Sequence, residues 1–144
     1  SDEAIVNVKA DGDLNGDWDA DRLAQVISNL VGNAIHHGSV DHPIDIELEG
    51  DGVGVSFSVR NQGAPITATL QKVLFDPFRR GERESNSQKT EGVGLGLFIS
   101  REIIEKHGGR IDVSSTAASG TMFTFTLPRA SKPISKLDGS KKLT

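Results

Sequence analysis

Apolar residues recur at helical spacing over one long stretch of the chain, residues 19–37. An apolar side chain returns every three or four positions there, at Leu23, Val26, Ile27, Leu30, Val31 and Ala34. A single stripe of this kind predicts an amphipathic helix that packs one side against a core. Asp17 or Asp19 is a suitable N-cap, and Gly38 is well placed to end the helix.

Shorter segments alternate apolar and polar residues and predict strands. They are residues 3–9, 44–48, 53–59, 110–115 and 121–127. Asp51-Gly52 suits a tight hairpin turn, and a second hairpin is expected around residues 117–120. A short helical run should end near Phe75, and a longer helix is predicted over residues 94–107. This order predicts an α/β (α+β) two-layer sandwich, in which helices cover one face of a mixed, mostly antiparallel sheet.

Two segments have little to bury. Residues 79–93 are charged and polar, which predicts a long mobile loop of the kind that is usually functional or disordered. Residues 131–144 hold four lysines and one aspartate among serines, which predicts a disordered tail or a linker. The globular domain is therefore expected to be residues 1–130.

Composition narrows the class of protein. A chain of 144 residues fits one domain, and its net charge of −4 argues against a nucleic-acid binder. The absence of cysteine excludes disulfides and thiolate metal sites, and it is consistent with the cytoplasm. The chain has no run of 18 apolar residues and does not begin like a signal peptide. We expect a soluble domain, whether its parent protein is soluble or membrane-anchored.

A set of polar residues shares one face of the first predicted helix, separate from the apolar stripe. Its members are Gln25, Asn29, Asn33, His36 and His37: the first three are four residues apart, and the two histidines follow Asn33 by three and four residues. Asparagine is a poor helix former, so two amides one turn apart are unusual there. The face is either merely solvated, or its carboxamide oxygens bind a hard cation such as Mg²⁺.

Two further segments carry candidate chemistry. Residues 92–97 read Gly-Val-Gly-Leu-Gly-Leu and enter a helix, where glycines allow close approach and free N–H groups favour phosphate. A polar loop rather than a strand precedes them, so a dinucleotide-binding βαβ unit is not indicated. Asn61-Gln62-Gly63 follows a strand, and the amide of Asn61 can give and accept hydrogen bonds in a pocket or simply mark an ordinary turn.

Five short motifs, in this order, resemble those of the ATP-binding catalytic domain of sensor histidine kinases. They are Asn29-Leu30-Val31-Gly32-Asn33-Ala34, Asn61-Gln62-Gly63, Phe75-Asp76-Pro77-Phe78, residues 92–97, and Gly120-Thr121-Met122-Phe123. The resemblance covers residues 17–129. That family belongs to the GHKL superfamily, with the Hsp90 and MutL proteins and type II topoisomerases. It implies the Bergerat ATP-binding fold and the ligands ATP and Mg²⁺.

The resemblance also implies roles for individual residues. Asn33 would bind Mg²⁺ with help from Asn29, His36 would lie near the phosphates, and His37 near the sugar or base. Arg79, Arg80 or Arg83 would reach the γ-phosphate from a lid over residues 79–93, so that Asn29, His36, Arg79 and Arg80 form the catalytic set. The remaining nucleotide-binding positions would be Asn61, Gly63, Ile66, Phe78, Gly92, Val93, Gly94, Leu95, Gly96, Leu97 and Thr121.

Three positions depart from the patterns of the family or its relatives. Asn61 stands where most members have an aspartate that accepts from the adenine amino group, and Pro65 replaces a glycine. Similar Asn-x-Gly variants are found in some phytochrome-like kinases. Asn29 stands where hydrolytic relatives carry a glutamate, and an amide is no general base at neutral pH. This choice favours holding ATP for transfer over hydrolysing it.

The resemblance finally implies a reaction and its partners. The domain would transfer the γ-phosphoryl group of Mg-ATP to a histidine on a dimerisation domain, and a response regulator would act downstream. His36, His37, His42 and His107 do not lie in a phosphoacceptor motif. We therefore expect that histidine outside the chain and a monomeric isolated domain. The alternatives are a nucleotide-binding regulatory module with little catalysis, and an anti-sigma-type serine kinase.

Overall fold

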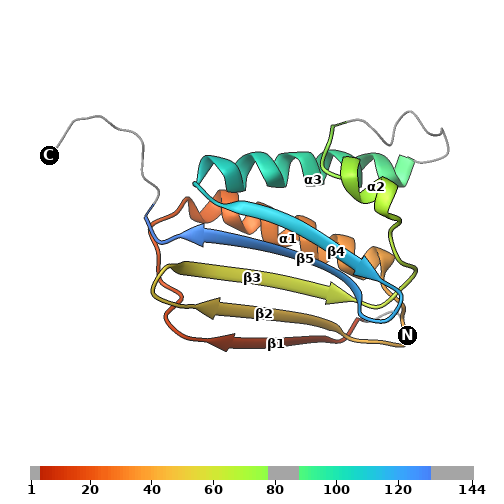
Figure 1. The fold of residues 1–144 in the computed structure, drawn as a ribbon, viewed down its shortest axis with the longest axis horizontal. Helices are drawn as coiled ribbons and strands as arrows, with labels where there is room; N and C mark the ends of the chain where they lie inside the picture. Colours follow the sequence, from red (N-terminus) through yellow and green to blue (C-terminus); the bar gives the residue numbers. More distant parts are fainter. Residues whose placement is uncertain (1–3, 78–87, 131–144) are drawn as a thin grey trace, which may run out of the picture.

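A five-stranded sheet with helices on one face forms the domain, in a computed structural model that describes residues 4–77 and 88–130 (Figure 1). For residues 88–94 it describes the helical backbone only. In chain order the elements are β1 (Val6–Asp11), α1 (Ala20–His37), β2 (Ile44–Gly50), β3 (Gly54–Asn61), α2 (Ala68–Val73), α3 (Gln88–Lys106), β4 (Arg110–Thr116) and β5 (Gly120–Pro128). This order confirms the order that the sequence predicts.

The strand order is β1-β2-β3-β5-β4. β1 and β2 are parallel, as a crossover through α1 requires, and the other three pairs are antiparallel. The prediction of a mixed, mostly antiparallel sheet in a two-layer sandwich is thus confirmed. The chain returns through β5 between β3 and β4, so the end of β3 lies beside the start of β5.

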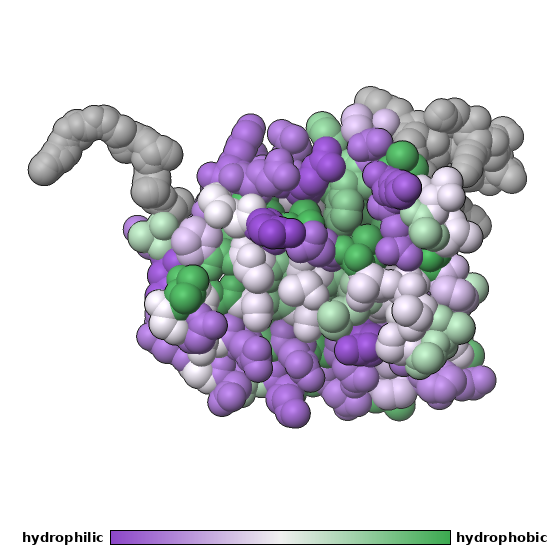
Figure 2. All heavy atoms as spheres, viewed as in Figure 1, coloured by the Kyte–Doolittle hydropathy of each residue, from purple (hydrophilic) through white to green (hydrophobic). Residues whose placement is uncertain are grey.

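Period-two alternation gives the sheet one buried and one solvated face. Toward the helices it presents Phe57 and Phe125, stacked at 5.1 Å between ring centroids, and Phe123, which meets Phe75 edge-on. Toward solvent β3 and β5 present serine and threonine, and Figure 2 shows this face as mainly hydrophilic or weakly coloured. The core therefore lies entirely on the helix side.

The predicted caps of α1 are confirmed. The side chain of Asp19 accepts a hydrogen bond from the backbone N–H of Arg22, and Gly38 closes the last turn through its N–H to the oxygen of Ala34. The buried residues of α1 are Val26, Leu30 and Ala34, all from the predicted stripe. This fixes the amide-bearing side of α1 away from the sheet.

The start of α3 was predicted wrongly. The helix begins at Gln88 rather than at residue 94, so residues 88–93 of the predicted loop are helical. Glutamine, lysine and glutamate at positions 88, 89 and 91 are good helix formers, although they leave no apolar stripe to recognise. Extending an existing helix is also far easier than nucleating one, which outweighs roughly 1 kcal/mol for each glycine. The rest of that loop, residues 79–87, and the predicted tail at 131–144 lie outside the described residues.

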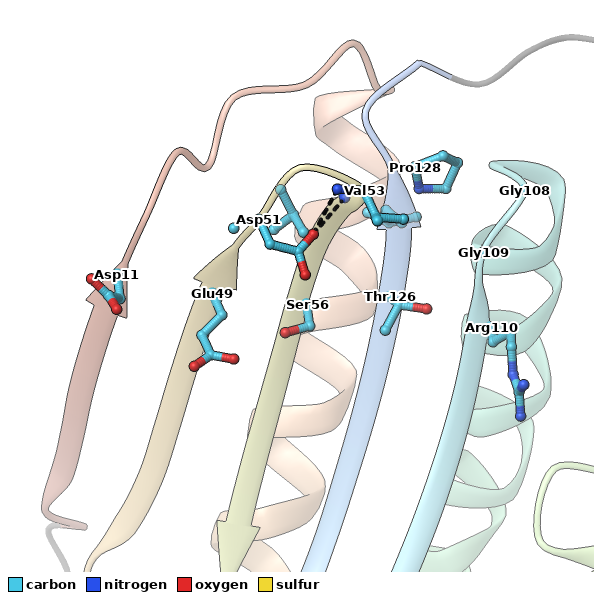
Figure 3. A pocket seen from close by; sticks show the side chains of 14 residues that line it. Asp11, Glu49, Asp51, Val53, Ser56, Gly108, Gly109, Arg110, Thr126 and Pro128 are labelled. Atoms are coloured by element: carbon cyan, nitrogen blue, oxygen red, sulfur yellow. Dashed lines mark hydrogen bonds between the residues drawn. The ribbon is translucent and has the colours of Figure 1, made fainter.

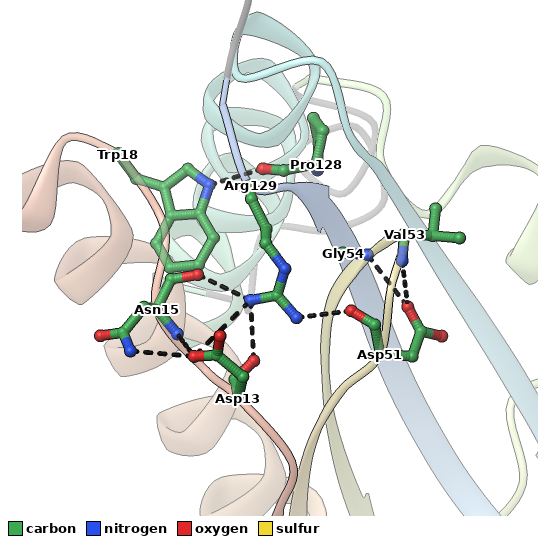
Figure 4. A network of polar contacts seen from close by, with 8 residues as sticks. All are labelled: Asp13, Asn15, Trp18, Asp51, Val53, Gly54, Pro128 and Arg129. Carbon is green, nitrogen blue, oxygen red and sulfur yellow. Dashed lines mark hydrogen bonds and ion pairs between the residues drawn. The ribbon is translucent and has the colours of Figure 1, made fainter.

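Arg129 ties three distant segments together at the end of β5 (Figure 4). Its guanidinium donates to the backbone oxygens of Asp13, Asn15 and Asp51. Beside it, the indole N–H of Trp18 donates to the oxygen of Pro128 at 2.7 Å. These contacts join the β1–α1 connection to the β2–β3 hairpin. No helix in the described part of the chain is long and apolar enough to span a membrane.

Candidate functional site

The polar side of α1 faces α3 at Asn29. The amide nitrogen of Asn29 donates to the backbone oxygen of Gly96 at 3.3 Å and to the hydroxyl of the fully buried Ser100 at 3.2 Å. A Cβ on Gly96 would lie 3.5 Å from the Asn29 amide, which is an ordinary van der Waals contact, so this approach does not depend on glycine. Both bonds use the side-chain nitrogen of Asn29. The side-chain carbonyl oxygen is the other polar atom of this amide.

Asn33, one turn further along α1, carries the most unusual atom in the site. Its Oδ1 is buried and accepts no hydrogen bond from the described residues. An unpaired buried acceptor costs about 1–3 kcal/mol, so native proteins rarely keep one without a reason. Because it lies on the helix face predicted to bind a cation, this oxygen fits a hard cation such as Mg²⁺.

His36 and His37 follow at the end of α1. Both are exposed, with ring centroids 4.8 Å apart and the rings perpendicular. They lie in the last turn of α1, where the helix dipole favours positive charge. The structure thus leaves the rings beside the amide-bearing face, as the sequence predicts.

The buried face of the sheet ends in a row of three polar residues. Asn61 of β3 pairs with Thr121 of β5, and Thr121 pairs with Ser115 of β4. Asn61 is 4% exposed and Thr121 is 5% exposed. The adjacent row on the same face is entirely apolar. The polar row therefore lies at the end of the apolar core, beside the candidate site.

Close backbone packing brings this row to the end of α1. The N–H of Ser39 donates to the oxygen of Gln62 at 2.6 Å. A Cβ on Gly63 would lie 2.7 Å from the backbone oxygen of His37, and one on Gly38 would lie 3.1 Å from the Cβ of Asn61. Gly63 therefore requires glycine for this approach, whereas a Cβ on Gly38 would collide chiefly with the backbone oxygen of Ala34, at 2.7 Å. Gly120, at the start of β5, has φ +82°, and a side chain there would collide with the backbone oxygen of Asn61.

Hydrogen bonds hold Ile66, another predicted contact, on both sides. Its N–H donates to the hydroxyl of Ser115 at 2.9 Å, and its carbonyl accepts from the side chain of Gln71 at 2.8 Å. Ser115, Gln71 and Ser100 were not predicted from the sequence. A signal for Ser115 was present, because it continues the inward alternation of Ile111 and Val113 as a polar residue.

The glycine-rich segment is not a free helix N-terminus, and that prediction was wrong. Residues 92–97 lie inside α3, which begins four residues before them. Backbone N–H groups within a helix are bonded to the preceding turn, so they form no open cradle for phosphate. The structure describes the side chains of Leu95, which is 36% exposed, and Leu97, which is buried in the core.

The remaining predicted residues divide into two groups. Phe75 packs on the core, and the guanidinium of Arg101 lies 6.0 Å from its ring centroid. Phe78, Arg79, Arg80 and Arg83 fall outside the described residues.

A separate pocket of about 500 Å³ lies at the opposite end of the sheet (Figure 3). One row of paired positions crosses it, from Asp11 and Glu49 through Ser56 and Thr126 to Arg110. Arg110 already pairs with Asp112 at 3.4 Å. Within residues 4–77 and 88–130, no group of three His, Cys, Asp or Glu residues could hold a metal ion. The residues that line this pocket include no amide side chain, unlike the polar side of α1.

Comparison with known proteins gives a consistent result. Residues 18–131 match the family described as histidine kinase-, DNA gyrase B- and HSP90-like ATPases. The chain is 38% identical over 109 residues to the bacteriophytochrome of Pseudomonas aeruginosa. The aligned residues cover 76% of this chain and 15% of that protein. It is 41% identical over 106 residues to the heme sensor protein HssS of Staphylococcus haemolyticus, covering 74% of this chain and 22% of that one. The chain thus spans only about a fifth or less of these relatives.

Solved structures agree with the sequence relatives. The catalytic domain of the histidine kinase ThkA superposes with a TM-score of 0.70 at 35% identity, covering 87% of this chain and 80% of that one. A mycobacterial sensor histidine kinase, MprB, shares the fold with a TM-score of 0.70 at 21% identity, over 90% of this chain and 86% of that one. With its two-layer fold and the amides of α1 in place, the chain belongs to the family of histidine kinase-, DNA gyrase B- and HSP90-like ATPases.

Proposed function

We propose that this chain is the ATP-binding catalytic domain of a two-component sensor histidine kinase. It binds Mg-ATP and transfers the γ-phosphoryl group to a histidine on a dimerisation domain, from which a response regulator is phosphorylated. The domain acts in the cytoplasm and is monomeric when isolated. Membership of the family and the 35% identity to the ThkA catalytic domain support this proposal.

The observation that carries the proposal is the buried Oδ1 of Asn33, which has no hydrogen-bond partner among the described residues. Mg²⁺ prefers oxygen ligands and keeps several waters and phosphate oxygens, so one or two protein oxygens are enough. Asn33 supplies one such oxygen. Asn29 supplies a second nearby, because its nitrogen is already bonded to α3.

The polar row at the end of the sheet fits the adenine base. The side-chain nitrogen of Asn61 donates to the backbone oxygen of Gln62 at 3.4 Å, so the side-chain carbonyl oxygen is the atom of this amide that can accept from an amino group. Thr121, paired with Asn61 across the strands, supplies a hydroxyl. Gly63 and Ile66 complete the turn that carries Asn61, and His37 lies at the adjoining end of α1.

Phosphate recognition needs a local change at the start of α3. Residues 92–97 can offer their N–H groups only if the first turns of α3 open. Their three glycines lower the stability of the helix there and so favour this opening. His36, Arg79 and Arg80 would supply positive charge toward the phosphates, and Phe78 would hold the near end of the lid. Bound Mg-ATP supplies the phosphoryl group, and this chain's residues position it and stabilise its charge.

Calorimetry with ATP in the presence and absence of Mg²⁺ tests the binding step. We expect a Kd between about 1 μM and 1 mM that depends on Mg²⁺. No heat across that range would contradict the proposal.

Phosphotransfer is then tested with the dimerisation domain of the parent protein. Acid-labile phosphohistidine is the expected product. Tight ATP binding without any phosphohistidine would favour the regulatory module, and phosphoserine on a partner would favour the serine kinase.

A further inference from the structure

Ser115 occupies the third position of the polar row, beside Thr121. Its neighbours along the inward face of β4 are the apolar residues Ile111 and Val113, so a hydroxyl at this position interrupts an otherwise apolar face. The register places Ser115 directly opposite Thr121, which in turn lies opposite Asn61.

Two hydrogen bonds define what the Ser115 hydroxyl can do. It accepts the N–H of Ile66 at 2.9 Å, and it lies 2.6 Å from the hydroxyl of Thr121. A serine hydroxyl has one proton to donate and two lone pairs. With one lone pair engaged by Ile66, the Ser115 proton is available to Thr121 at a distance typical of a strong O–H···O bond. When Thr121 accepts that proton, its own proton is free to point away from Ser115.

We infer that Ser115 is a positioning residue that makes Thr121 a hydrogen-bond donor in the base pocket and thereby sets a preference for adenine over guanine. The inference rests on the proposed function. Adenine presents an amino donor beside the ring acceptor N1, whereas guanine presents a carbonyl acceptor beside an N–H donor. The carbonyl oxygen of Asn61 and a donating Thr121, directly or through a water, match adenine and oppose guanine.

A purely structural role for Ser115 makes a different prediction. If Ser115 only braces Ile66, which Gln71 also holds, its loss should weaken all nucleotides equally. If it orients Thr121, its loss should weaken ATP and leave GTP nearly unchanged. The ratio of the two affinities therefore separates the two roles.

The experiment measures Kd for Mg-ATP and Mg-GTP by calorimetry on wild type, Ser115→Ala and Ser115→Thr. We expect Ser115→Ala to lower ATP affinity, and with it the ATP-to-GTP ratio, about three- to tenfold, as one hydrogen bond would. Ser115→Thr keeps the hydroxyl and should restore the ratio. Ser114→Ala removes an exposed hydroxyl one residue away on the solvent side of β4 and should change nothing.

A double variant tests whether Ser115 acts through Thr121. Thr121→Val should lower the ratio as Ser115→Ala does, and combining the two should add no further loss. Circular dichroism confirms folding of each variant. If Ser115→Ala does not fold, Ser115→Cys, whose thiol is a weak donor, should show the same loss of ratio.

Distinct outcomes overturn distinct claims. An unchanged ratio in Ser115→Ala, an equal loss for both nucleotides, or no recovery in a folded Ser115→Thr would overturn the role of Ser115 alone. A wild-type domain that binds no ATP would overturn the proposed function together with it.

Discussion

Replacing Asn33 with alanine should stabilise the domain and remove its metal-dependent ligand binding at once. The change deletes a buried oxygen that accepts no hydrogen bond from the described residues, and burial of such an atom costs about 1–3 kcal/mol. Alanine is also the better helix former, by up to about 0.7 kcal/mol. Loss of the packing of a half-buried side chain offsets part of this gain. We expect the free energy of unfolding without nucleotide to rise by about 1 kcal/mol, and Tm by a few degrees.

The effect on binding has the opposite sign. Removing a group that only supports a metal ligand typically lowers metal affinity about 10- to 100-fold, so loss of a direct ligand should cost at least as much. The Mg²⁺-dependent part of ATP binding should therefore fall by about two orders of magnitude in Asn33→Ala. Asn33→Asp keeps an oxygen at the same place and should retain most of it.

Urea denaturation and calorimetry, with and without EDTA, measure the two effects separately. Gly32→Ala is the matched control, because Gly32 is exposed beside Asn33 and a Cβ there meets no atom within 4 Å. It should raise stability by roughly 0.5–1 kcal/mol and leave ATP affinity unchanged. If Asn33→Ala lost several kcal/mol of stability and bound ATP like wild type, Asn33 would be structural and the site wrongly placed.

Three further predictions follow from the site and its supports. Asn61→Asp should change the free energy of ATP binding by about 1 kcal/mol or less, because the gain from a stronger acceptor is offset by the cost of burying its charge. Asn61→Ala should lower ATP affinity more. Equal ATP affinity in wild type and both variants would remove Asn61 from the site. Hydrogen bonds, chiefly from the N–H of Gly54, lower the pKa of Asp51. The ionised carboxylate therefore contributes its full stabilisation above the ordinary pKa of 3.8, and this stabilisation is lost as the pH falls through the lower pKa of the folded state. Acid titration of Asp51→Asn should accordingly show a shallower loss of stability below that pH, and an unchanged slope would refute this. Gly63→Ala places a Cβ 2.7 Å from a backbone oxygen of α1 and should weaken both stability and ATP binding, whereas Gly52→Ala, with open space around it, should alter ATP binding little.

Local patterns were sufficient to predict the framework of the site. The stripe and caps of α1, the alternation of β3 and the turn at Asp51 each depend on residues close in sequence. The amide face of α1 follows from helical geometry alone once the stripe is known. These elements place Asn29 and Asn33 on one face of α1 without any knowledge of the tertiary structure.

Contacts between distant segments could not be predicted in the same way. Arg129 bonds to Asp13, 116 residues away, and nothing local to either residue indicates the other. The pairing of Asn61 with Thr121 depends on β5 returning between β3 and β4, which is a property of topology. The start of α3 was missed for a different reason, because glycines lower the helical signal of a segment that an adjoining helix extends into.

The side chains that the structure gathers at the site also bear on its chemistry. Asn29, Asn33, Asn61, Thr121 and Ser115 are amides and hydroxyls, and none of them accepts a proton readily at neutral pH. Such a set can orient a nucleotide and its metal but offers no base to activate water. Negative charge on the phosphates would be balanced by Mg²⁺ and by cationic groups rather than by these residues. Under the proposed function, such a set would favour retention of ATP until an acceptor arrives, which is the requirement for phosphotransfer to another domain.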